Sequence, residues 1–297
     1  MALPPFCPTG VGSLPDQRVE LALARVAQHC PHLPFAPQLP QAGPRRGMIA
    51  EALLGPAVPP GLTALLDAAR RGAFPQAQAL KSQLTGPITA HLCAPKSGSL
   101  LRVAEVIAAR AEAQAQAIIS VGQRPVIVLD EPCLGLPGLP PRGAVLEALR
   151  RPILAAQARG ALVGLHCCSA MDLGLLDELP LSIYSFDADH GLEATLHHPA
   201  VRRLFRRGGV LALGIAPTDR APSVEGMEAR LRAAIVASGW TVTGLGPQLW
   251  LTASCGLGLC SPPLAERIME ATARLGQRLV FGCHPASFVV SPQEHAE

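Results

Sequence analysis

The feature that most restricts the fold of this chain is a regular alternation of short, largely apolar runs with longer amphipathic stretches. Runs of four to six residues that stay apolar along their length are typical of parallel strands buried on both faces. Eight such runs can be identified, at residues 9–14, 35–39, 79–84, 125–129, 161–165, 181–186, 210–215 and 249–252.

The stretches between these runs have helical periodicity. The clearest is 100–119, where apolar residues at spacings of three and four form one stripe. Asp16 is placed to cap a first helix, and most of the prolines lie between the expected elements. Further helices are expected at 48–54, 62–69, 145–159, 192–205, 227–237 and 264–275.

Eight strands alternating with helices predict an α/β fold, a single (β/α)8 TIM barrel that spans residues 1–297 as one domain. An open doubly wound sheet also places ligands at the carboxyl ends of its strands. Only a closed ring, however, brings the ends of the first, fourth, fifth, sixth and eighth runs to a common point. Those ends carry the most reactive side chains of the chain, namely Ser13, Asp130, His166, Cys168, Asp187 and Cys255.

Composition argues against several classes of protein. The net charge is +3, the arginines are scattered, and aromatic residues make up 3% of the chain, which disfavours nucleic-acid binding. No apolar run approaches the roughly 20 residues that span a bilayer, and the N-terminus has no signal-peptide pattern. The nine cysteines are therefore expected to be free thiols or metal ligands of a cytoplasmic protein.

The segment 162–169, Leu-Val-Gly-Leu-His-Cys-Cys-Ser, is the strongest chemical signal. Residues two apart in a strand point the same way, so His166 and Cys168 are expected on one face at the carboxyl end of a strand. An imidazole and a thiolate at that separation favour a borderline-soft metal ion, zinc first. Cys167 is expected on the opposite face, in the core.

Six motifs in order resemble the C-terminal catalytic domain of the cobalamin-independent methionine synthase family, in its short single-domain form. They are Thr-Gly-Val-Gly-Ser-Leu-Pro, Leu-Thr-Gly-Pro-Ile-Thr, Leu-Asp-Glu-Pro, His-Cys-Cys, Ser-Phe-Asp-Ala and Ser-Cys-Gly-Leu. This family belongs to a barrel superfamily that includes uroporphyrinogen decarboxylase. The resemblance spans nearly the whole chain, without the duplicated N-terminal barrel of the full-length family.

The resemblance implies one zinc ion per chain and a small-thiol acceptor, homocysteine, that is converted to methionine. The implied metal ligands are His166, Cys168, Asp187 and Cys255, with Asp189 and His190 as competitors for the acidic position. The implied acceptor-binding residues are Gly12, Ser13, Glu51 and Asp130.

Two departures from the family pattern concern the methyl donor. The stretch 216–220, Ala-Pro-Thr-Asp-Arg, has no histidine where the family has its proton donor, and it offers Asp219 as the candidate catalytic acid. The tryptophan that stacks on the folate is also absent. The donor implied is therefore a methylcorrinoid such as methylcobalamin, carried by a corrinoid protein, more than a methyltetrahydrofolate.

Two alternatives remain open at the level of sequence. One is a methylcobamide:thiol methyltransferase of the coenzyme M type, with the same zinc chemistry and another acceptor. The other is a non-catalytic corrinoid- or metal-binding accessory protein. No membrane or nucleic-acid partner is expected, and Cys283 and His284 are assigned no role.

Overall fold

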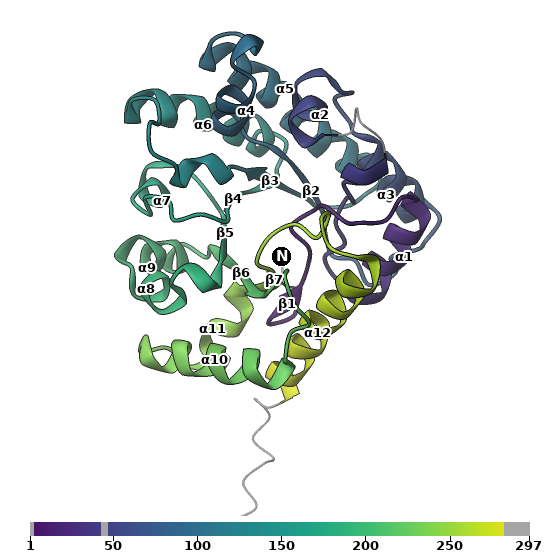
Figure 1. The fold of residues 1–297 in the computed structure, drawn as a ribbon, viewed down its shortest axis with the longest axis vertical. Coiled ribbons are helices and arrows are strands. Elements are labelled where there is room, and N and C mark those ends of the chain that lie inside the picture. Colours follow the sequence, from purple (N-terminus) through teal and green to yellow (C-terminus); the bar gives the residue numbers. More distant parts are fainter. Residues whose placement is uncertain (1–2, 43–46, 282–297) are drawn as a thin grey trace, which may run out of the picture.

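The strands form one parallel sheet that curls around a central axis, with helices on its outer side (Figure 1). The computed structural model describes residues 3–42 and 47–281. The strand order β1-β7-β6-β5-β4-β3-β2 places the first strand beside the last, as in a closing barrel. The strands are β1 (Cys7–Pro8), β2 (Leu80–Thr85), β3 (Pro125–Asp130), β4 (Leu162–Cys167), β5 (Ile183–Asp187), β6 (Val210–Ala216) and β7 (Leu249–Ala253).

Eight strands were predicted, and the described residues form seven. The first strand lies at Cys7–Pro8, ahead of the predicted run 9–14, and the predicted run 35–39 forms no strand. Instead, single bridges join Phe35 to Lys81 and Ser13 to Gln38. Prolines at 34, 37 and 40 lack the N–H groups that a continuous ladder requires. Residues 9–14 and 34–38 therefore form an irregular seam between β1 and β2.

The predicted helices are present. One of them is divided into two helices, and another has a different N-cap residue from the one predicted. The predicted helix 192–205 is divided at His198, which is extended because Pro199 follows it. Arg18 is the N-cap residue of the first helix, so the prediction that Asp16 caps it is wrong. The helices are α1 (Val19–His29), α2 (Met48–Leu54), α3 (Pro60–Arg70), α4 (Pro87–Cys93), α5 (Leu100–Ile119), α6 (Arg142–Gln157), α7 (Leu175–Glu178), α8 (Leu192–His197), α9 (Pro199–Arg206), α10 (Val224–Ala237), α11 (Val242–Leu245) and α12 (Pro262–Phe281).

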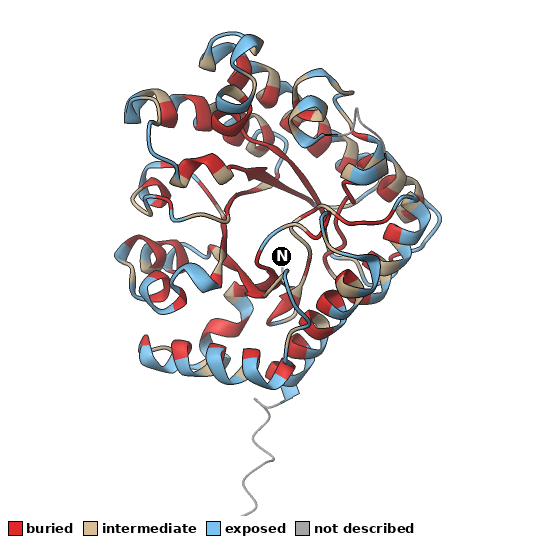
Figure 2. Ribbon diagram, viewed as in Figure 1, coloured by how far each residue is buried: buried red, intermediate tan, exposed pale blue. Residues whose placement is uncertain are grey.

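Two separate apolar cores follow from the alternation of side chains along the strands. The larger core lies between the outer face of the sheet and the helices. The smaller core lies inside the curled sheet and includes Val126, Val128, Ile183, Ala212 and Trp250. Figure 2 shows the strands buried and the outer faces of the helices exposed. None of the described helices combines the length and apolar character that crossing a bilayer requires.

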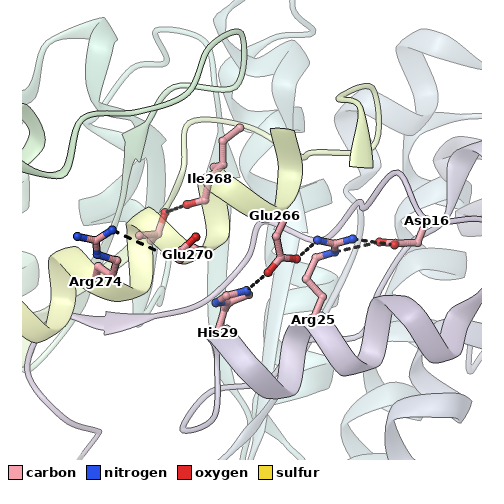
Figure 3. Close-up of polar contacts among 8 residues, drawn as sticks. Asp16, Arg25, His29, Glu266, Ile268, Glu270 and Arg274 are labelled. Carbon is pink, nitrogen blue, oxygen red and sulfur yellow. Dashed lines mark hydrogen bonds and ion pairs between the residues drawn. The ribbon is translucent and has the colours of Figure 1, made fainter. Parts of the chain in front are cut away.

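Charged side chains tie the first helix to the last (Figure 3). Arg25 on α1 pairs with Asp16, Nη2 to Oδ1, at 3.1 Å, and also with Glu266 on α12. Glu266 Oε1 lies 2.6 Å from His29 Nε2. The Arg25 and Asp16 side chains are 12% and 3% exposed, so solvent screens this pair little. Asp16 therefore stabilises the start of α1 through Arg25 instead of through a cap.

We expect Arg25→Met to lower the free energy of unfolding by about 3 kcal/mol, because it leaves the buried Asp16 carboxylate without its partner. Urea unfolding followed by circular dichroism measures the change. Arg18→Met is the matched control on the same helix, since Arg18 pairs with Glu20 and both are about 70% exposed. That control should cost less than about 0.5 kcal/mol. Equal midpoints for wild type and Arg25→Met would refute a stabilising role for the network.

Candidate metal centre

The histidine of the predicted His-x-Cys pair lies at the carboxyl end of β4, on the inner face of the sheet. The strand register places His166 beside Asp130 of β3 and Ser185 of β5. His166 Nδ1 is 2.9 Å from Ser185 Oγ, which orients the ring. His166 Nε2 is buried and has no hydrogen-bond partner. A buried ring nitrogen without a partner is costly unless a ligand completes it.

Cys168 and Cys255 bring two sulfur atoms to the same place. The Sγ atoms of both cysteines and a ring nitrogen of His166 all lie within 4.8 Å of one another. Cys168 directly follows β4, and Cys255 lies two residues after β7. His166 and Cys255 are 89 residues apart in the chain, and the three side chains meet because the curled parallel sheet gathers strand ends at one rim.

The loop that carries Cys255 is held by the segment that follows β1. Leu257 N donates to Ser13 O at 2.9 Å, and Gly258 N donates to Ser13 Oγ at 3.2 Å. A side chain at Gly256 would meet Ser13 Oγ at 2.1 Å, so only glycine permits this approach. Ser13, predicted to bind the acceptor, therefore lies directly against the loop of the metal-ligand candidate.

The two thiols are electrostatically unequal. A hydrogen bond from Cys168 and the nearby His166 ring stabilise the Cys255 thiolate and lower the pKa of Cys255 well below its ordinary value. The pKa of Cys168 is raised because the Cys168 thiol donates a hydrogen bond to Cys255 and is partly buried. In the metal-free protein, one sulfur is therefore held as a thiolate at neutral pH, as a metal ligand must be.

Alkylation of the metal-free protein tests whether Cys255 is held as a thiolate. We expect iodoacetamide to modify Cys255 at a rate that is nearly the same at pH 6 and pH 8, because its thiolate persists below neutral pH. The control is Cys93, which is also exposed, but whose pKa is raised by partial burial and by Cys133. Its rate should fall as the pH falls. Peptide mass spectrometry reports both sites, and a Cys255 rate that follows that of Cys93 would contradict the assignment.

The acidic residue predicted as the fourth ligand lies outside this three-residue cluster. Asp187 Oδ1 accepts a hydrogen bond from Asp189 N at 2.9 Å, and Asp187 Oδ2 is 3.2 Å from His190 Nδ1. Asp189 in turn pairs with Arg230 of α10. Asp187 and His190 line a neighbouring pocket at the ends of β4 and β5. None of the three joins the group formed by His166, Cys168 and Cys255 in the described residues.

Asp130 ends β3 beside His166 and is 6% exposed. Burial raises the pKa of Asp130 to about 6, while His166 and Lys81 act in the opposite direction. Its Oδ1 atom has no hydrogen-bond partner, and neither does Gln38 Oε1 at the seam. Each of these buried oxygen atoms can still accept a hydrogen bond from a donor that reaches it.

The remaining predicted residues lie in different environments. Gly12 O accepts from Gln38 N at 3.0 Å, so the backbone around Gly12 forms part of the seam. Glu51 lies on α2, half-buried, in a pocket that Gln38 and Arg110 also line. Asp219 is 70% exposed after β6 and pairs with Arg220, at 2.9 Å. Cys283 and His284 lie outside the described residues.

Sequence reasoning missed a polar column on the inner face of β2. Lys81, Gln83 and Thr85 alternate along the strand and are 4%, 2% and 2% exposed. The intervening Ser82 faces outward and donates to Gln114 of α5 at 2.7 Å. The period of two in Leu-Lys-Ser-Gln-Leu-Thr is the signal that identifies this column, because a strand buried on both faces is otherwise apolar.

Neither a protein-family model nor a curated protein matches this sequence. Among solved structures, the chain is similar to a B12-independent methionine synthase from Shewanella sp. W3-18-1 in complex with selenomethionine, with 18% identity and a TM-score of 0.52 over 73% of this chain and 67% of that one. It is also similar to a D-psicose 3-epimerase with D-tagatose from Clostridium cellulolyticum H10, with 10% identity and a TM-score of 0.50 over 93% and 97%.

The chain has a barrel-type α/β fold. At these identities the likeness extends to the fold alone, and two enzymes of different chemistry share it, as is usual for barrels. The barrel fold predicted from the six motifs is therefore supported, and the superfamily stays a prediction. The metal ion, the methyl donor and the acceptor must be argued from the site.

Proposed function

We propose that this chain is a zinc-dependent thiol S-methyltransferase of the cytoplasm that transfers a methyl group to homocysteine and forms methionine. The observation that carries the proposal is the cluster of His166, Cys168 and Cys255 at the carboxyl rim of the sheet. One imidazole and two thiolates are a donor set that suits zinc, and three protein ligands leave a position for a substrate, as in catalytic zinc sites.

The residues present fit a zinc ion. His166 Nε2 is buried and unpartnered, and the bond between Nδ1 and Ser185 is the kind that orients a metal-binding imidazole. For Nε2 to present its lone pair, Nδ1 carries the hydrogen and donates it to Ser185 Oγ. A bound zinc ion would supply Lewis acidity that keeps an acceptor thiol deprotonated at neutral pH. We propose that a carboxylate, with Asp187 as the candidate, is the fourth zinc ligand and that the acceptor thiol replaces it.

The chain's own residues would bind and orient the acceptor beside this cluster. Asp130 lies beside His166, and its orphaned Oδ1 accepts hydrogen bonds only, so it is proposed to bind the acceptor's ammonium group. Ser13 lies against the Cys255 loop, where it would take the acceptor's carboxylate together with the backbone of Gly12. This pairing favours an amino-acid thiol over a coenzyme M type thiol, because a sulfonate thiol carries no ammonium group. Glu51 is proposed to assist Asp130.

The donor is proposed to be a methylcorrinoid, presented by a corrinoid protein. The support is that the loop after β6 has no histidine and that its acid, Asp219, is exposed beside Arg220. A cobalt–methyl bond can transfer its methyl group without protonation of the leaving group, whereas a folate nitrogen must be protonated. An exposed carboxylate at this position is consistent with a site that has no buried proton donor.

The test measures metal content and methyl transfer in the same preparation. We expect purified protein to hold about one zinc ion per chain and to convert methylcobalamin and homocysteine to methionine. Mercaptoethanesulfonate is the matched acceptor without an ammonium group, and methyltetrahydrofolate is the alternative donor. A metal-free preparation with full activity would overturn the proposal. Stoichiometric zinc without transfer to any thiol would assign the chain to a metal-binding accessory role.

A further inference from the structure

The chain has only two lysines, and one of them is buried inside the curled sheet. Lys81 is 4% exposed on the inner face of β2, whereas Lys96 is exposed. Burying an ammonium group among apolar side chains is costly unless hydrogen bonds compensate for it. Its neighbours on the inner face of β3, Val126 and Val128, are apolar. The burial of Lys81 therefore requires hydrogen bonds that compensate for it, and these indicate its role.

The contacts of Lys81 identify that role. Its Nζ atom donates to Val11 O at 2.8 Å and to Gln83 Oε1 at 3.0 Å. Gln83 Nε2 donates in turn to Ala36 O at 2.6 Å. Both carbonyl groups belong to the seam between β1 and β2, where the sheet has isolated bridges instead of an eighth strand. Side chains of β2 thus supply donors that a continuous ladder would otherwise provide.

The seam segment that Lys81 holds is also the one proposed to bind the acceptor. Val11 lies between Gly10 and Gly12, and a side chain at Gly12 would meet Gln83 at 2.5 Å, so this loop packs directly on the Lys81–Gln83 pair. The next residue is Ser13, which accepts from Gly258 N in the Cys255 loop. A path of direct contacts therefore leads from β2 through the seam to the candidate metal centre.

We propose that Lys81 and Gln83 are positioning residues that hold the loop 10–13 in its acceptor-binding conformation by donating to the carbonyls of Val11 and Ala36. The part of this inference that concerns the acceptor rests on the proposed function, whereas the part that concerns the loop does not. Neither residue belongs to the candidate metal cluster. Their effect should appear in the binding of the acceptor and not in the chemical step.

The experiment compares Lys81→Met with Lys96→Met, a matched pair because these are the only lysines and only one is buried. Gln83→Met is the second variant, which removes the donor to Ala36 and keeps Lys81. Hydrogen exchange of the zinc-loaded protein, read in peptides that cover 9–14 and 34–38, reports the loop without any assay of activity. The exchange rate should rise about tenfold in both β2 variants, the factor for 1.4 kcal/mol, and stay unchanged in Lys96→Met.

Steady-state kinetics with homocysteine complete the test. In Lys81→Met, KM for homocysteine should rise about tenfold while kcat stays within about threefold and zinc content is unchanged. Unchanged exchange in 9–14 overturns the inference, as does faster exchange spread equally over β4 and β6, which would indicate a general loss of stability. Faster loop exchange with an unchanged KM overturns the link to the acceptor. If the wild type methylates no thiol, the proposed function fails and exchange alone decides the role of Lys81.

Discussion

Cys255→Ser is expected to lower the affinity for zinc by more than about 100-fold and to reduce methyl transfer to background. Substitutions outside a metal's ligand shell already cost about 10- to 100-fold in affinity, and a lost ligand should cost more. A serine hydroxyl does not ionise near neutral pH and is a poorer zinc ligand than a thiolate. Cys168→Ser should behave in the same way, because its sulfur belongs to the same cluster.

The matched control for these variants is Cys260→Ser. Cys260 lies five residues beyond Cys255 and is half-buried; its Sγ donates to Thr218 O at 3.2 Å, and it is not a member of the cluster. It should keep its zinc and its activity. Metal analysis after dialysis against a weak chelator, with circular dichroism to verify folding, measures the outcome. Stoichiometric zinc in a folded Cys255→Ser variant would place the metal elsewhere and remove the basis of the proposed reaction.

Asp130→Asn is expected to raise KM for homocysteine by roughly 30-fold or more, the factor for about 2 kcal/mol. The substitution keeps the shape of the side chain and removes the charge that would face the acceptor's ammonium group. Zinc content should be unchanged, because Asp130 lies outside the cluster. Asp67→Asn, at an exposed carboxylate paired with Arg70, is the control and should leave KM at the wild-type value.

The pH dependence gives Asp130 a signature of its own. Because burial raises its pKa to about 6, the carboxylate that binds ammonium is present above that pH and is lost as the pH falls through it. KM of the wild type should therefore rise below about pH 6, and this rise should be absent in Asp130→Asn. The kinetics are measured between pH 5 and pH 8 with zinc in excess. The same acid limb in both proteins would assign the effect to another group.

Parts of the site were predictable because they depend on local rules. The period of two in a strand predicted that His166 projects with Cys168 and away from Cys167, and the structure places Cys167 in the outer core. The same rule applied to β2 identifies Lys81 and Gln83. The pairing of Cys168 with Cys255 was predicted only through a resemblance of motifs, since no local rule links residues that far apart in the chain.

Other parts depended on contacts that the sequence does not specify. Asp187 contacts His190 and caps the turn that follows β5, and its role as a metal ligand stays a prediction. Asp16 matched a helix cap, yet Arg25 is its partner, because α12 brings Glu266 to the same place. The short Asp16 side chain had several partners of similar energy within reach. Packing of distant elements selected one of them.

The sequence by itself determined the alternation of strands and helices, and with it the parallel sheet and the rim where the reactive side chains gather. Apolar periodicity decides these features because burial of apolar surface dominates the energy of each element. Only the tertiary structure decided that the ring has an irregular seam in place of an eighth strand and that β2 supplies its donors. That outcome depends on backbone groups from three separate segments meeting at one place, and their hydrogen bonds leave no periodic pattern in the chain.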